Sequence, residues 1–273
     1  MLKYCFNNFR CNMGQNKYGV QFGGDSIIKL FPGSNVKDIN INNLTDYREG
    51  YRQVNKNLKN NIFNINLGGD HSIAVSTIQP LLDFYRKDLL VIWIDAHGDI
   101  NTFNTSLTQN IHGMPLGALT GLMNHWYPVK QSRFILPFNN LLYVGVRELD
   151  PIESIIVKDK KILNYPNYQE NIIDIIQNHP AKYIHISCDI DGLDPINMPS
   201  TGTIVPNGLS VSDVTTIIRA SKDRLVSFDL VEFNPHIGNY RAVYKTLLNI
   251  YSILSSVIAH RDDFRDYFMR DYL

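Results

Sequence analysis

Residues 89–99 read LLVIWIDAHGD and join an apolar run to a group of polar side chains. The six residues from Leu89 to Ile94 have the length and character of a buried β-strand. Asp95, His97 and Asp99 follow directly, and their spacing by two would place all three on one face if the strand continued. Taken alone, this D-x-H-x-D pattern is equally consistent with a solvated turn.

The same kind of apolar run recurs on both sides of this stretch. Further strands are predicted at 62–67, 141–146, 183–188 and 225–231. Helices are predicted at 210–220, where Ser210 is the expected N-cap, and at 241–260, where apolar residues recur every three or four positions. Strands that alternate with helices indicate an α/β fold around a parallel sheet.

Composition excludes several classes of protein. The chain has 273 residues, of which 26 are Lys or Arg and 26 are Asp or Glu, so its formal net charge is zero. We therefore expect no nucleic acid and no membrane as partners, and the apolar runs are shorter than the 18 or so residues of a membrane helix. The three cysteines show no C-x-x-C spacing, which favours a reducing, cytoplasmic location over a disulfide framework.

Chemically active side chains follow four of the predicted strands. His71 comes after strand 62–67 and the glycine pair at 68–69, Asp189 and Asp191 after strand 183–188, and Glu232 after strand 225–231. The carboxyl ends of parallel strands share one edge of a sheet, so we expect these groups to converge with those of the 89–99 stretch. Several carboxylates brought together repel one another unless a cation neutralises them. The sequence therefore predicts a metal centre.

The predicted ligands are four aspartates and two histidines. They are His71, Asp95, His97, Asp99, Asp189 and Asp191. Oxygen donors with one imidazole per ion suit Mn²⁺ better than a thiolate zinc site. We expect two ions, which would lower the pKa of a shared water from about 15.7 towards about 7. Cys188 alternates with Asp189 and is predicted to point into the core.

Three motifs in order resemble the arginase and agmatinase (ureohydrolase) family. They are GGDHS at 68–72, DAHGD at 95–99 and SCDIDGLDP at 187–195, and the likeness runs from GQNKYGV at 14–20 to EFNP at 232–235. The resemblance implies a single domain over residues 1–273 with a three-layer fold, in which helices flank a parallel sheet of about eight strands. It also implies a binuclear Mn²⁺ centre, with His71 and Asp99 on one ion, His97 and Asp191 on the other, and Asp95 and Asp189 bridging.

Within this family, the segment after the second motif separates the substrates. Here DINT at 99–102 and NIHGMP at 110–115 are similar to arginase, whose amino-acid substrate carries an α-carboxylate, and not to agmatinase. Substrate-binding roles are thereby implied for Asn101, Thr108 and Asn110 at the carboxylate and for Thr203 at the rim. Asp150 is the residue expected to contact the α-ammonium, with Glu153 supporting it from behind.

The resemblance also implies the chemistry, which is the hydrolysis of L-arginine to L-ornithine and urea. Glu232 would hold the guanidinium group by a charge-assisted pair. Asp99 would pass a proton to the departing amine, and His112 would exchange protons with bulk water. Family members are commonly trimers or hexamers, so a homo-oligomer is expected.

Some positions differ from the family pattern. Gln109 replaces a usual Gly, Gly24 replaces a usual Pro, and Asn7, Asn8 and Arg10 are expected to interrupt an N-terminal strand. Differences in the head-group segment leave alternatives open: agmatine, guanidinobutyrate or formiminoglutamate as the substrate, or a non-catalytic metal-binding protein such as an arginine sensor.

Overall fold

One sheet of eight parallel strands forms the middle layer of the molecule, as expected from the sequence. The computed structural model describes residues 3–123 and 134–268, with side chains as far as residue 259. The strands are β1 (Tyr4–Cys11), β2 (Val36–Ile41), β3 (Phe63–Leu67), β4 (Leu89–Ile94), β5 (Leu141–Val144), β6 (Leu163–Tyr165), β7 (Tyr183–Asp189) and β8 (Leu225–Val231). Their spatial order is β2-β1-β3-β8-β7-β4-β5-β6.

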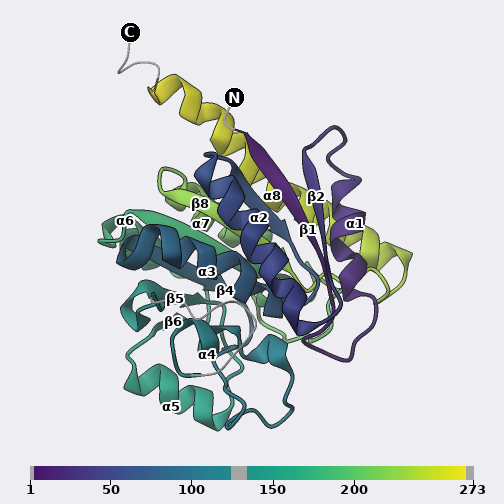
Figure 1. Cartoon of the computed structure of the whole chain (residues 1–273). Coiled ribbons are helices and arrows are strands. Elements are labelled where there is room, and N and C mark those ends of the chain that lie inside the picture. Colours follow the sequence, from purple (N-terminus) through teal and green to yellow (C-terminus); the bar gives the residue numbers. More distant parts are fainter. Residues whose placement is uncertain (1–2, 124–133, 269–273) are drawn as a thin grey trace.

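Helices cover both faces of the sheet (Figure 1). They are α1 (Gly23–Ile28), α2 (Tyr47–Lys59), α3 (Ala74–Tyr85), α4 (Pro115–Leu119), α5 (Pro151–Asp159), α6 (Asn171–Asn178), α7 (Val211–Ser221) and α8 (Tyr240–Phe268). One apolar core lies between the sheet and helices α1, α6, α7 and α8, and a second lies between the sheet and helices α2, α3 and α4. The predicted three-layer fold is therefore confirmed.

The predicted strands match the observed ones closely. The bounds of β4 and β8 are those expected, β3 begins one residue later, and β7 includes Asp189. β5 stops at Val144, two residues early, because Gly145 adopts a φ of +92° that ends the extended backbone. Cys188 lies fully buried among apolar side chains, as predicted.

The first strand corrects the expectation of an interruption. β1 is continuous, because its asparagines find partners on neighbouring elements: Asn7 Nδ2 donates to Asn66 Oδ1 of β3 (2.7 Å), and Asn8 Nδ2 donates to Asp25 Oδ1 of α1 (2.8 Å). Buried amides are tolerated where they are hydrogen-bonded. Asn8 also explains Gly24, since a side chain there would overlap the Asn8 amide oxygen.

Helices α7 and α8 begin as the sequence indicates. Ser210 caps α7 in a reciprocal capping box with Asp213. By length and composition alone, Tyr240–Ala259 of α8 could cross a membrane, a criterion that buried core helices also meet. Polar residues are scattered along this segment, so it contains no long uninterrupted apolar run. Ile250, Leu254 and Val257 of α8 are fully buried in the core.

Candidate metal centre and active site

The turn after β3 presents His71 at the edge of the sheet. Gly69 lies against the backbone of β1, and a Cβ there would overlap the carbonyl oxygen of Cys11. Asp70 then caps a short 3₁₀ helix over His71–Ile73, its side chain accepting the Ser72 N–H at 3.0 Å. Close backbone packing and this cap place the His71 imidazole in the interior, fully buried.

The turn after β4 reaches the same point by a route that differs from the one expected. The strand ends at Ile94, so Asp95, His97 and Asp99 do not share a strand face. Their convergence comes from the loop: Ala96 N–H donates to Asp191 Oδ1 (3.1 Å), and Asp99 takes a left-handed φ of +48°. Aspartate tolerates that conformation better than most residues.

The turn after β7 resembles the one after β3. Asp189 caps a 3₁₀ helix over Ile190–Gly192, with its side chain accepting the Asp191 N–H at 2.9 Å. Both carboxyl groups are thereby directed into the edge where the β3 and β4 turns meet, and both residues are at most 4 % exposed.

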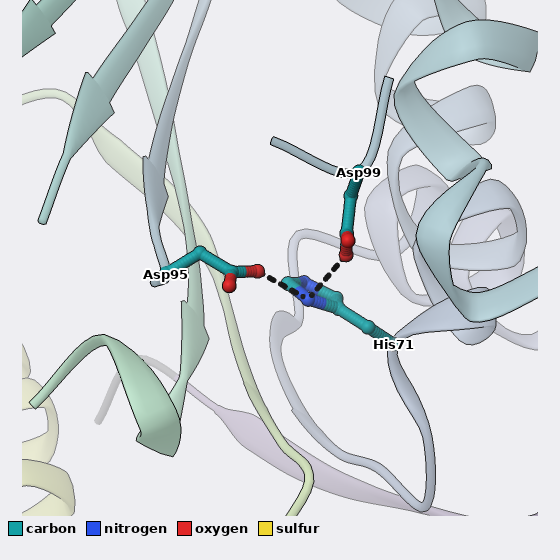
Figure 2. A group of neighbouring side chains, drawn as sticks. All are labelled: His71, Asp95 and Asp99. Carbon is teal, nitrogen blue, oxygen red and sulfur yellow. Dashed lines mark ion pairs between the residues drawn. The ribbon is translucent and has the colours of Figure 1, made fainter. Parts of the chain in front are cut away.

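Two groups of potential metal ligands result, and Asp95 belongs to both. In the first, His71 Nδ1 lies 3.0 Å from Asp95 Oδ2, 3.3 Å from Asp99 Oδ2 and 3.4 Å from Asp189 Oδ2. Figure 2 shows Asp95 and Asp99 pointing at this nitrogen. In the second, His97 Nδ1 lies 3.4 Å from Asp95 Oδ1 and 3.2 Å from Asp191 Oδ2. His71, Asp95 and Asp99, and likewise Asp95, His97 and Asp191, have potential ligand atoms within 4.8 Å of one another.

The electrostatics of these groups are those of a site in need of a cation. Burial raises the pKa of Asp191 to about 7, and the charge of Asp95 adds to the effect. Burial likewise raises the pKa of Asp189, and the Asp191 charge acts in the same direction. For His97, burial lowers the pKa, but bonds to Asp191 and Asp95 outweigh it and raise the pKa to about 12. Positive charge is thus strongly favoured between these carboxylates.

Glu232 lies beside the first group, at the end of β8. It adopts a left-handed φ of +67° and is 4 % exposed. Its Oε1 accepts the His71 N–H (2.9 Å) and lies 3.1 Å from His112 Nδ1, and its Oε2 accepts Gln15 Nε2–H (2.5 Å). Burial raises the pKa of this carboxyl, but contact with His112 outweighs burial and the pKa is lowered. Glu232 is therefore a buried anion that faces the metal-ligand groups.

A cavity of about 410 Å³ opens above these groups. The predicted residues that line it are His97, Asp99, Asn101, Thr108, Asn110, His112, Glu153, Asp189, Asp191, Thr203 and Glu232. His71 and Asp95 lie behind the lining, both fully buried. The structure thus brings together the residues proposed for metal binding and most of those proposed for substrate binding.

Among the predicted substrate-binding residues, Asp150 is the one that does not line this cavity. Its carboxylate caps α5, accepting the N–H groups of Ile152 and Glu153, both at 2.8 Å. It also accepts Asn101 Nδ2–H at 2.7 Å. In this structure Asp150 orients Asn101, while Glu153 supplies the carboxylate on the cavity wall.

The sequence analysis overlooked Gln15 and Lys17, which also line the cavity. Gln15 bonds to Glu232, and Lys17 Nζ donates to the carbonyl oxygen of Gly202 and lies 3.5 Å from Thr203 Oγ1. Both residues belong to the GQNKYGV segment at 14–20, whose likeness to the family does not by itself indicate a role for either side chain. The family likeness of this segment was a signal, but the contacts of the two side chains span about 185 and 217 positions of sequence, which no local pattern reveals.

Comparisons with known proteins agree with this geometry. A sequence model described as the arginase family matches residues 8–258. An arginase of Plasmodium berghei is 39% identical over 203 residues, which cover 68% of this chain and 56% of that protein. The chain thus spans less than two thirds of the length of the curated relatives it matches first.

Solved structures extend the likeness to nearly the whole fold. An arginase from Bacillus subtilis superposes with a TM-score of 0.80 and 28% identity, covering 93% of this chain and 98% of that one. An Entamoeba histolytica arginase in complex with L-ornithine gives a TM-score of 0.80 and 29% identity, covering 92% and 97%. Structures titled putative agmatinase and formimidoylglutamase are 18% identical, a likeness that shows the fold alone.

Proposed function

The chain belongs to the arginase family, and we propose that it is a manganese enzyme that hydrolyses L-arginine to L-ornithine and urea. One observation carries the proposal: two His/Asp groups that share Asp95 lie below a cavity whose wall holds the anionic carboxylate of Glu232. This arrangement has a place for a cationic guanidinium group next to a place for metal.

The residues present fit a pair of divalent ions. The buried Nδ1 of His71 has no hydrogen-bond partner, although three carboxylate oxygens lie within 3.4 Å of it. A buried polar atom without a partner among acidic groups is the mark of a ligand atom. Carboxylate oxygens with one imidazole per ion favour Mn²⁺. One ion would be held by His71 and Asp99 and the other by His97 and Asp191, while Asp95 and Asp189 would contact both. Such ions supply hydroxide at neutral pH by lowering the pKa of a water.

The protein's own residues would bind and orient the substrate. Glu232 holds the guanidinium by a charge-assisted pair and keeps its carbon facing the floor of the cavity. Asn101, Thr108 and Asn110 also line the cavity wall and offer neutral donors to an α-carboxylate. Glu153, on the same wall, offers an acceptor for the α-ammonium group.

Two further residues would move protons. Asp99 lies on the cavity wall among the metal-ligand groups, where its carboxylate would accept a proton and pass it to the departing amine. For His112, burial lowers the pKa, but the bond to Glu232 outweighs it and raises the pKa to about 9. The His112 side chain is 23 % exposed, so it can exchange that proton with solvent.

Urea release from L-arginine by the Mn²⁺-loaded protein tests the proposal. The substrate panel includes agmatine and guanidinobutyrate, because a substrate with a different head group is the second candidate. Two observations favour it: Asp150 is engaged in capping α5, and Gln109 departs from the family pattern. If the protein releases urea faster from agmatine than from arginine, agmatine is the substrate and the proposal of arginine is wrong. Absence of turnover on every substrate, with two ions per chain counted by elemental analysis, would contradict the enzymatic role and favour an arginine sensor.

We also propose a cytoplasmic homo-oligomer, a trimer or hexamer, built from a single domain. All three cysteines are free and buried, which suits a reducing compartment. Tyr240, Tyr244 and Leu248 are between 49 % and 81 % exposed along one stripe of α8, a surface suited to contact between copies. Light scattering coupled to gel filtration measures the oligomeric state.

A further inference from the structure

Gln15 makes a buried contact that the proposed mechanism does not yet use. Its side-chain amide donates to Glu232 Oε2 at 2.5 Å, across 217 positions of sequence, and the residue is 7 % exposed. The other Glu232 oxygen, Oε1, accepts the His71 N–H and contacts His112. Each carboxylate oxygen is therefore held separately, and Gln15 supplies the donor on Oε2.

The backbone around Gln15 is held firmly enough to make that donor a fixed one. The Gly14 N–H donates to Asp70 Oδ2 (2.7 Å), and the His112 N–H donates to the Gly14 carbonyl oxygen (3.3 Å). A Cβ on Gly14 would lie 2.7 Å from the Cβ of His112, so the segment runs in close contact with the residues of the site. Asp70 is itself buried and anchored by Ser72.

We propose that Gln15 is a positioning residue for guanidinium binding: it prevents the Glu232 carboxylate from rotating and so aligns the substrate carbon. This inference rests on the proposed function of Glu232. A carboxylate held on both oxygens presents one orientation, whereas one held on Oε1 alone can turn about its last side-chain bond. Misalignment of a reacting group by about 1 Å can lower a rate about 100-fold.

A residue that aligns the substrate and a residue that only adds affinity have different kinetic effects when they are removed. Loss of Gln15 should act on the guanidinium end of the substrate and leave the head-group end unchanged. It should therefore lower kcat more than it raises KM for L-arginine. L-Norvaline, which has the amino-acid head group and an alkyl chain without a terminal nitrogen, should inhibit with an unchanged constant.

The experiment compares Gln15→Leu with Gln177→Leu, the same substitution at an exposed glutamine of α6. In the Mn²⁺-loaded proteins we expect Gln15→Leu to lower kcat by about 10- to 100-fold with KM changed less than about 3-fold. Metal content and inhibition by L-norvaline should equal those of the wild type, and Gln177→Leu should behave as the wild type throughout. Gln15→Met, which keeps the length of the side chain without its donor, replaces Gln15→Leu if that variant does not fold.

Crystal structures of the metal-loaded wild type and the Gln15 variant give a readout independent of turnover. The inference expects the Glu232 carboxylate to turn away from its wild-type position in the variant. An unchanged carboxylate together with an unchanged kcat would overturn it, as would a loss of metal that accounts for the loss of rate. If the wild type and Gln177→Leu release no urea, the proposed function fails, and the position of Glu232 in the two structures still decides the role of Gln15.

Discussion

The imidazole of His71 stacks on the indole of Trp93, with ring centroids 4.0 Å apart and an angle of 6° between the planes. Trp93 Nε1–H also donates to Asp95 Oδ2 at 3.0 Å, and His71 Nε2 lies 2.9 Å from Ser187 Oγ. The indole therefore orients both an imidazole and a carboxylate of the first ligand group. Groups behind the ligands tune a metal site through such contacts.

Trp93→Phe should weaken metal binding by about 10- to 100-fold, because the hydrogen bond to Asp95 is lost while an aromatic face is kept. Mn²⁺ titration followed by calorimetry measures the affinity. The unfolding free energy of the metal-free variant serves as the control for lost packing. An affinity equal to that of the wild type would show that the indole does not support the site.

Asp99→Asn should reduce turnover by at least about 100-fold while the protein keeps part of its metal. The amide cannot accept the proton that the proposed step transfers, whereas Asn tolerates the left-handed backbone of Asp99. Rates and elemental analysis are compared with those of Asp223→Asn, at an exposed aspartate that follows α7. An unchanged rate at full metal occupancy would contradict the assignment of Asp99.

The fold could be predicted because buried parallel strands leave a strong local signal. The run at Leu89–Ile94 is apolar at every position and is buried at every position. Strand β1 gave a misleading signal, because Asn7 and Asn8 look like breaks in a strand. Their partners, Asn66 and Asp25, are supplied by other elements, and only the folded structure reveals these contacts of the amide N–H groups.

The predicted ligands converge, but the expected reason for their convergence was wrong in part. Alternation along an extended strand was expected to align Asp95, His97 and Asp99, whereas a turn with a left-handed residue does so. Gln15 was missed for a related reason. A residue type as ordinary as glutamine acquires a role only through its partner, here Glu232, which lies far away in the sequence.

Gly69→Ala should destabilise the protein by about 3 kcal/mol or more, because the added methyl group would overlap the Cys11 backbone of the neighbouring strand, which cannot move aside freely. Gly113→Ala is the matched control, since the nearest atom to the new Cβ, Asp99 Oδ1, would lie 3.9 Å away. Urea denaturation of the metal-free proteins gives both values. Equal stability of the two variants would contradict the packing argument.

Glu153 should make the stability of the metal-free protein fall as pH rises from about 4.5 to above 7. Burial raises the pKa of this carboxyl to about 7 in the folded chain, from 4.5 when unfolded. Over that window the folded state binds more protons than the unfolded state, so raising the pH favours unfolding, by up to about 3 kcal/mol.

The pH dependence is isolated by comparing the wild type with Glu153→Gln in urea at pH 5 and pH 8. The variant cannot ionise, and it should lose less stability between the two pH values than the wild type. Asp191 contributes in the same direction in both proteins, since its pKa is also raised to about 7. Equal losses in wild type and variant would show that Glu153 ionises as freely in the folded state as in the unfolded chain.

Lys17 should favour arginine over agmatine. Among the described residues that line the cavity, it is the only lysine or arginine, and it donates to Gly202 on the rim. Both substrates carry a guanidinium and an ammonium group, but only arginine also carries a carboxylate, which the Lys17 ammonium group attracts. Agmatine lacks that carboxylate, so its interaction with Lys17 is purely repulsive. An interaction of about 1 kcal/mol near a protein surface corresponds to roughly a 5-fold effect.

The preference for arginine is measured as kcat/KM for arginine divided by kcat/KM for agmatine. Lys17→Met should lower this ratio by about 5-fold. Lys56→Met, at an exposed lysine of α2, is the control and should leave the ratio unchanged. Charge is the cause only if ionic strength matters: raising the salt concentration should reduce the preference of the wild type and leave that of the Lys17 variant almost constant. A ratio that falls equally at all salt concentrations would instead assign the effect to the lost hydrogen bond with Gly202. A ratio that does not change would remove Lys17 from substrate selection and leave head-group recognition to the neutral donors of the cavity wall, such as Asn101 and Asn110.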